Sequence, residues 1–116
     1  MKPKLAPETN RRATRRKGLR QSCDLVLPDQ TTRRAVTVDT GVDGVSFLSS
    51  RPITPGTRCQ VRFELPLPDR LVVVQGELKT VYSSYSGADG FKIGAVFSRL
   101  DENTAAALRE FLAAAP

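Results

Sequence analysis

The sequence predicts a mainly-β domain, a barrel or a sandwich of short antiparallel strands, with one helix at its C-terminal end. Three observations lead to this fold class: apolar and polar residues alternate in short segments, glycine and proline separate these segments, and helical periodicity appears only near the end. At 116 residues the chain has room for one hydrophobic core and one domain. Such a small domain must hide its sheet edges by closure or by a covering element.

Six strands are expected along the chain. Asp29 lies in a Pro-Asp-Gln turn that joins the first two strands into a hairpin, and the alternation is clearest in the fourth strand. Prolines separate the third, fourth and fifth strands, and a loop rich in Ser, Gly and Asp precedes the sixth. The expected strands cover residues 23–27, 35–38, 45–48, 59–65, 71–82 and 91–97.

The last segment of the chain has the pattern of a helix over residues 102–114. Asp101 is the expected N-cap, and Pro116 follows the end. Four apolar residues fall near one face of this helix, which we therefore expect to flank or close the sheet. They are Leu100, Ala105, Leu108 and Leu112.

Positive charge is concentrated at the N-terminus. Residues 1–20 hold eight of the eighteen basic side chains and one of the twelve acidic ones, which leaves ten basic and eleven acidic side chains for the rest. The net charge of +6 therefore belongs to an arm that precedes a nearly neutral body. We expect a flexible basic arm over residues 1–18 and the folded domain over residues 19–116.

The composition favours binding over catalysis. The chain has no histidine, so the commonest general base and the commonest metal ligand are missing, and neither a carboxylate pair nor an activated serine stands out. We therefore expect no enzyme, no catalytic residues, no metal and no cofactor. Cys23 and Cys59 lie in expected strands, outside any CxxC pair, and are predicted to be packing residues. Without an apolar run long enough for a membrane span or a signal peptide, a cytoplasmic location is expected.

Two motifs point to a particular family. The arm carries Arg12-Ala13-Thr14-Arg15-Arg16, an RxxxR motif that Arg11 extends to RRxxxR, and the bend after the second strand carries Asp39-Thr40-Gly41-Val42-Asp43-Gly44. Together these motifs resemble those of the PilZ domain, which has RxxxR before the first strand and (D/N)xSxxG between the second and third. Gly41 stands where the family usually has serine.

The resemblance covers most of the chain, because the segment 91–97 and the final helix look like the last barrel strand and the terminal helix of that family. It implies a six-stranded antiparallel β-barrel with a C-terminal α-helix. Other pairs of arginines in the arm also satisfy RxxxR. The pair Arg12 and Arg16 is preferred, since it places Leu19, Cys23 and Leu25 at the apolar entry to the first strand.

The family binds the bacterial second messenger cyclic di-guanylate (c-di-GMP), and the residue types fit this ligand. A guanidinium group matches the O6 and N7 acceptors of guanine or grips a phosphate, and the carboxylate of Asp39 can accept from N1–H and N2–H₂. Gly41 and Gly44 are expected to supply positive φ or close approach of the backbone to the ligand. The missing serine costs about 1 kcal/mol unless water or Ser46 compensates. The candidate ligand-binding residues are Arg11, Arg12, Arg16, Asp39, Gly41 and Gly44, with Arg15 and Ser46 as further candidates.

We therefore expect a c-di-GMP receptor whose arm is loose without ligand and wraps over the barrel with it, changing the surface offered to an unidentified protein effector. In the family, arginine before RxxxR goes with an intercalated ligand pair, so Arg11 implies two ligands per chain. Two alternatives remain open: a PilZ-like interaction module that has lost the ligand, and a small barrel that binds RNA through its basic arm. Nucleic acid is the less favoured partner, because the arm lacks aromatic residues.

Overall fold

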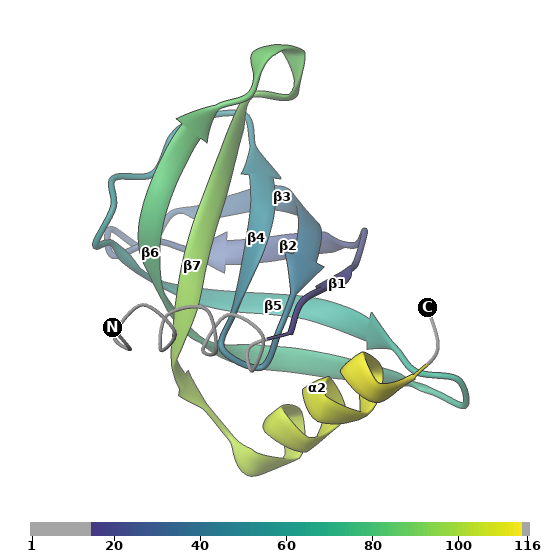
Figure 1. The fold of residues 1–116 in the computed structure, drawn as a ribbon. Helices are drawn as coiled ribbons and strands as arrows, with labels where there is room; N and C mark the ends of the chain where they lie inside the picture. The colour runs from purple at the N-terminus through teal and green to yellow at the C-terminus, as the bar shows by residue number, and fades with distance from the viewer. Residues whose placement is uncertain (1–14, 115–116) are drawn as a thin grey trace, which may run out of the picture.

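The computed structural model describes residues 15–114, which form strands, one short 3₁₀ turn and one α-helix (Figure 1). The strands are all antiparallel, and the first of them contains two residues. In chain order the elements are β1 (Lys17–Gly18), β2 (Ser22–Val26), β3 (Thr32–Thr40), β4 (Gly44–Ser49), β5 (Arg58–Pro66), β6 (Leu71–Tyr85), η2 (Gly87–Asp89), β7 (Phe91–Leu100) and α2 (Glu102–Ala113).

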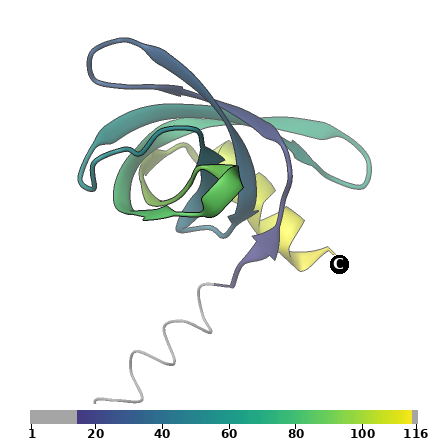
Figure 2. The ribbon, with the colours of Figure 1, turned by 90° about the horizontal axis from the view of Figure 1, so that it is seen from above.

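The sheet closes on itself into a barrel. Its strand order is β1-β3-β2-β5-β6-β7-β4, and an additional pairing of β3 with β4 joins the two ends. The closed curl of strands β2–β7 is visible when the molecule is seen from above (Figure 2). The expected six-stranded antiparallel barrel is thus confirmed, and the short β1 is added outside it, along β3.

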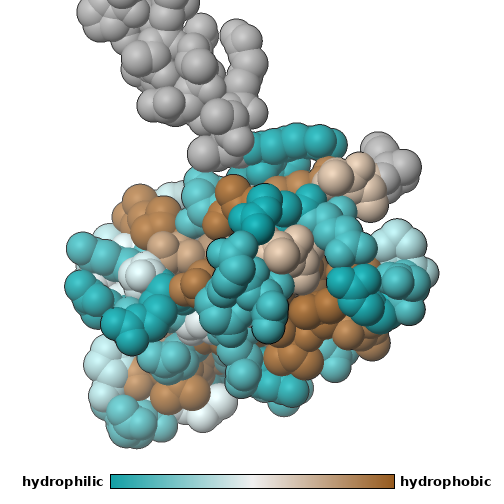
Figure 3. Space-filling view, turned by 90° about the horizontal axis from the view of Figure 1, so that it is seen from below, coloured by the Kyte–Doolittle hydropathy of each residue, from teal (hydrophilic) through white to brown (hydrophobic). Residues whose placement is uncertain are grey.

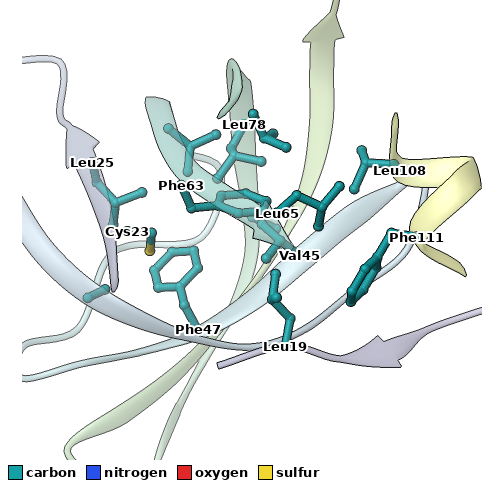
Figure 4. Close-up of a cluster of buried hydrophobic side chains, with 14 of the residues drawn as sticks. Leu19, Cys23, Leu25, Val45, Phe47, Phe63, Leu65, Leu78, Leu108 and Phe111 are labelled. Atoms are coloured by element: carbon teal, nitrogen blue, oxygen red, sulfur yellow. The ribbon is translucent and has the colours of Figure 1, made fainter. Parts of the chain in front are cut away.

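Alternation along the strands places one set of apolar side chains inside the barrel. In β5 every second residue is buried, as its sequence pattern predicts: Cys59, Val61, Phe63 and Leu65 face inward. Figure 4 shows Phe63 and Leu65 of β5 in one cluster with side chains of the other strands and of the helix. Burial raises the pKa of the Cys23 thiol to about 12, so this cysteine is an inert packing residue, as expected.

Helix α2 lies across the end of the barrel opposite the β6–β7 hairpin (Figure 1). Asp101 is its N-cap, as predicted, and accepts a hydrogen bond from the backbone N–H of Thr104 at 2.8 Å. The buried face repeats at three- and four-residue spacing, which turns one apolar stripe toward the strands. Its buried residues are Thr104, Ala107, Leu108, Phe111 and Leu112.

Several boundaries differ from those expected. β3 begins at Thr32, β6 continues to Tyr85 and β7 continues to Leu100, so Leu100 belongs to a strand and not to the helix. Cross-strand hydrogen bonds extend these strands through polar residues that a hydrophobic pattern does not mark. The part of the expected arm that the structure describes, residues 15–18, includes strand β1, so order begins before Leu19.

Three register shifts interrupt the ladders, one between Thr37 and Asp39 on β3 and two in the ladder of β6 with β7. Such bulges bend a strand and redirect the side chains beside them. The shift on β3 lies next to Asp39, and one of those in the β6–β7 ladder lies between Thr80 and Tyr82. Both places border the site described below.

Candidate functional site

Strand β1 brings the arm to the glycine-containing bend. Lys17 pairs with Thr40 and Gly18 with Asp39, so the preceding residue, Arg16, lies at the bend itself. Arg16 donates hydrogen bonds from Nε (3.1 Å) and Nη2 (2.8 Å) to Oδ1 of Asp39. Its Nη1 lies 3.5 Å from Oδ1 of Asp43, within ion-pair distance. The structure therefore joins Arg16 of the RxxxR motif to the bend, 23 residues further along the chain.

Asp39 organises this contact from the end of β3. Ser46, opposite it on β4 and buried, donates its hydroxyl to the same Oδ1 at 3.0 Å. Oδ1 thus accepts three hydrogen bonds, while no donor among residues 15–114 reaches Oδ2. One carboxylate oxygen fixes Arg16 and the other remains as an acceptor beside it.

The bend itself is closed by its own backbone. Gly41 donates its N–H to the carbonyl oxygen of Gly44 (2.9 Å), which also accepts from the hydroxyl of the buried Thr40 (3.0 Å). The backbone N–H of Phe97 donates a hydrogen bond to the backbone carbonyl oxygen of Asp43 (2.9 Å), which connects the bend to β7. The loop between β3 and β4 is therefore held in place on both sides of the site.

The two glycines of the bend act through space and not through unusual dihedral angles. Neither has a positive φ, so that part of the expectation is wrong. Close approach of the backbone to a ligand stays a prediction; within the protein, a Cβ atom on Gly44 would lie 2.2 Å from the carbonyl oxygen of Ala95, and one on Gly41 would lie 2.6 Å from that of Arg15. The absence of a side chain at Gly44 lets β7 approach, and its absence at Gly41 lets the arm lie on the bend.

The remaining candidates contribute less to the contacts that the structure describes. Arg15 is exposed, and its backbone carbonyl packs on Gly41. Arg11 and Arg12 lie outside the described residues. Arg16, the second member of the preferred pair, is the arginine that lies at the bend, and the pairing with Arg12 stays a prediction.

A pocket of about 320 Å³ opens beside Arg16 and Asp39. The arm and the end of β3 form one side, and β6 and β7 form the other. Sequence reasoning missed two members of this second side, Tyr82 and Lys92, because the strand pairing that brings them to the bend is not visible in a linear pattern. The pocket is lined by Arg16, Asp39, Ser46, Val81, Tyr82, Lys92, Gly94, Ala95 and Val96.

A larger groove of about 710 Å³ lies elsewhere, over the outer faces of β2, β5 and β6. Both acidic and basic side chains line it, among them Asp24, Arg62 and Glu77, and none of the predicted site residues takes part. Volume alone does not identify a site, whereas the smaller pocket is lined by Arg16 of the first motif and Asp39 of the second. We therefore regard the pocket at Arg16 as the candidate site.

Two further findings concern the described part of the chain. Within residues 15–114 there is no group of three or more Cys, Asp and Glu side chains placed to hold a metal ion. In the same range, no helix has both the length and the apolar character needed to cross a membrane.

Comparison with known proteins defines the class of this fold. The family model of the PilZ domain matches residues 10–114. Among solved structures, the PilZ domain of YcgR from Escherichia coli with c-di-GMP has a TM-score of 0.67 at 16% sequence identity, and the match covers 88% of each chain. The chain therefore belongs to the PilZ domain family. Both motifs of the candidate site lie inside the matched range.

A second solved structure, the inhibitor of motility MotI/DgrA of Bacillus subtilis, has a TM-score of 0.71 at 11% identity. The match covers 80% of this chain but 45% of MotI, so the chain spans less than half of that protein. At these identities the likeness to both structures is one of fold. Among curated proteins, none matches the chain.

Proposed function

We propose that this PilZ domain is a receptor for c-di-GMP that binds the ligand through its RRxxxR and DxGxxG motifs and acts as a ligand-switched adaptor toward a protein partner. One observation carries the proposal: Arg16 of the first motif meets Asp39 of the second at the mouth of a pocket. Family membership and the likeness to the c-di-GMP-bound PilZ domain of YcgR support it.

The chemistry of the contact suits a guanine nucleotide. Asp39 accepts hydrogen bonds from Nε and Nη2 of Arg16. A guanidinium has five N–H donors, so further donors remain for O6 and N7 of guanine or for a phosphate. Oδ2 of Asp39 remains to accept from N1–H or N2–H₂ of a base. Because Oδ1 already binds Arg16 and Ser46, we propose that Asp39 uses one oxygen for the ligand, and not both as the sequence suggested.

The remaining arginines of the arm extend this site in the proposal. Arg12 completes RxxxR, and Arg11 favours an intercalated pair of ligands. Isothermal titration calorimetry tests the stoichiometry directly: two ligands per chain are expected for the wild type and one for Arg11→Ala. An unchanged stoichiometry in the variant would contradict the role given to Arg11.

The central experiment is calorimetry of the full chain with c-di-GMP in moderate salt, with guanosine monophosphate as the control ligand. Arg16→Ala should weaken binding by roughly tenfold to a hundredfold, because it removes charge-assisted hydrogen bonds. Asp39→Ala should also weaken binding and reduce the preference for guanine over adenine dinucleotides. Arg62→Ala, which removes the same charge from an exposed residue outside the pocket, serves as the matched control and should bind normally.

Two other outcomes would favour the alternatives. Absence of binding would favour the second candidate, a ligand-independent interaction module. Two observations support this candidate: Gly41 replaces the usual serine, and Arg16 is already paired with two aspartates. Binding of any polyanion with a steep dependence on salt would favour an RNA-binding barrel. Saturable binding of c-di-GMP that guanosine monophosphate does not match would support the receptor.

A further inference from the structure

The wall of the pocket opposite the arm includes Tyr82 on β6 and Lys92 on β7. Neither residue belongs to the two motifs. Tyr82 lies directly after a register shift in the β6–β7 ladder, where a strand turns its side chains to new directions. The position of this wall therefore depends on the irregularity of the ladder.

The ring of Tyr82 lies on the backbone of β7. Its cross-strand partner is Gly94, and a Cβ atom at that position would lie 2.1 Å from Cε2, 2.5 Å from Cζ and 2.7 Å from Cδ2 of the ring. Glycine at position 94 is therefore required for the ring to rest there. One side of the ring is supported by the strand, while the residue as a whole keeps 42% of its surface exposed.

A ring laid over a cross-strand glycine stabilises a sheet by itself, so this packing alone does not indicate a ligand. The surroundings do. The same pocket holds Arg16, the acceptor oxygen of Asp39 and the apolar side chains of Val81 and Val96, both of which are exposed. An exposed aromatic ring beside a guanidinium and a carboxylate offers the three elements of base recognition: a stacking surface, donors and an acceptor.

Lys92 adds a positive charge to this wall. It stands between Leu48 of β4 and Ser84 of β6 in the sheet, and it has no ion pair within residues 15–114. Arg16, in contrast, is already paired with Asp39 and Asp43. Lys92 is therefore the cation of this pocket whose charge is not balanced by a neighbouring carboxylate, which suits a phosphate group.

We propose that Tyr82 is a stacking platform for a guanine base of the dinucleotide and that Lys92 binds one of its phosphates. This inference rests on the proposed function, since it concerns the same ligand. The ligand is then held between two walls: the arm and bend recognise edges of a base, and the β6–β7 wall supports a base face and neutralises a phosphate.

The composition of the chain allows a direct test. The protein has two tyrosines, Tyr82 and Tyr85, and no tryptophan, so tyrosine emission reports on these two rings alone. Tyr85→Phe leaves Tyr82 as the single emitter and keeps the ring that packs edge-on against Phe91 at 5.6 Å between centroids. c-di-GMP should quench the emission of Tyr85→Phe with the same concentration dependence as the heat of binding. Tyr82→Phe, in which Tyr85 is the emitter, should show little quenching.

Calorimetry of substituted chains completes the test. Tyr82→Leu should weaken binding on the order of tenfold, and Tyr82→Phe should restore most of the loss, because stacking requires the ring and not the hydroxyl. Lys92→Gln should weaken binding more than Arg62→Gln, which removes the same charge outside the pocket. Thermal melting of each variant shows whether it is folded.

Calorimetric binding of c-di-GMP by Tyr85→Phe without quenching, or equal affinities of Tyr82→Leu and the wild type, would overturn this inference while leaving the receptor intact. Equal affinities of Lys92→Gln and Arg62→Gln would overturn the phosphate contact. Absence of any calorimetric binding to the wild type would overturn the proposed function, and the inference with it.

Discussion

Gly41 lies beneath the N-terminal arm, where the carbonyl oxygen of Arg15 approaches to within 2.6 Å of the place that a Cβ atom would take. Cδ of Arg16 and Oδ1 of Asp43 lie at 3.0 and 2.9 Å from the same point. A side chain at position 41 would therefore displace the arm or the aspartate. In this chain the residue that replaces serine creates the space in which Arg16 reaches Asp39.

Gly41→Ser is therefore expected to weaken ligand binding several-fold, although it restores the residue usual in the family, because the arm can no longer lie on the bend. The measurement is calorimetry with c-di-GMP. Gly18→Ser is the matched control, since a Cβ atom at position 18 meets nothing within 4 Å. Tighter binding by Gly41→Ser would show that the lost hydroxyl matters more than the space.

At the scale of elements, strand β1 contacts two different parts of the domain through neighbouring residues. Arg16, just before the strand, binds the bend, while Lys17 reaches helix α2. Nζ of Lys17 donates to the carbonyl oxygens of Phe111 (3.0 Å) and Ala114 (3.3 Å) and lies 4.4 Å from the centre of the Phe111 ring. A cation at the C-terminal end of a helix also interacts favourably with the helix dipole. The arm thus links the candidate site to the C-terminal turn of α2.

Lys17→Met should lower the free energy of unfolding by about 0.5–1 kcal/mol, because the last carbonyls of α2 lose a charged donor while much of the aliphatic stem is kept. Urea denaturation measures this change. Hydrogen exchange should also become faster in the backbone of residues 110–114. Unchanged exchange in this segment would show that Lys17 does not hold the helix end.

Asp101, at the other end of α2, predicts a pH dependence. Its hydrogen bonds with Thr104 lower the pKa of the carboxyl below its ordinary value of 3.8. The stabilisation is therefore fully present above the ordinary pKa and is lost as the pH falls through the lower value of the folded state. Asp101→Ala should lower the melting temperature at neutral pH and make little difference in strong acid. An equal difference at both pH values would assign the effect to something other than the charged cap.

At the scale of the whole molecule, one hydrophobic cluster holds the closed barrel and the helix together. Leu108 and Phe111 of α2 reach the same group of side chains as Val45 and Leu65 of the strands (Figure 4). On the face seen from below, hydrophobic side chains form several patches separated by hydrophilic ones (Figure 3). The apolar side chains of the helix are thus largely buried against the barrel.

Leu108→Ala should destabilise the whole domain by about 2–5 kcal/mol, because a fully buried leucine leaves a cavity between helix and barrel. Chemical denaturation should show one cooperative transition at a lower midpoint. Arg109→Ala is the control, since this neighbouring side chain is 57% exposed. A second transition, in which the helix alone unfolds first, would contradict a shared core.

The sequence by itself determined the local features of this protein. Alternation predicted strand β5, Asp101 predicted the start of the helix, and the paired motifs predicted the family, because each of these signals lies within a few neighbouring residues or in a recognisable motif. Their ends were less predictable, since ladders continue through polar residues wherever a partner strand is present.

Only the tertiary structure decided what stands opposite the motifs. The contact of Arg16 with Asp39 joins residues 23 positions apart, and Tyr82 and Lys92 reach the same pocket through the shifted register of β6 and β7. The sequence indicated that Gly41 costs the site a hydrogen bond, whereas the position of Arg15 shows that glycine makes room for the arm. The physical reason is the same in each case: strand pairing and close packing bring distant residues together, and neither leaves a signal within a short stretch of sequence.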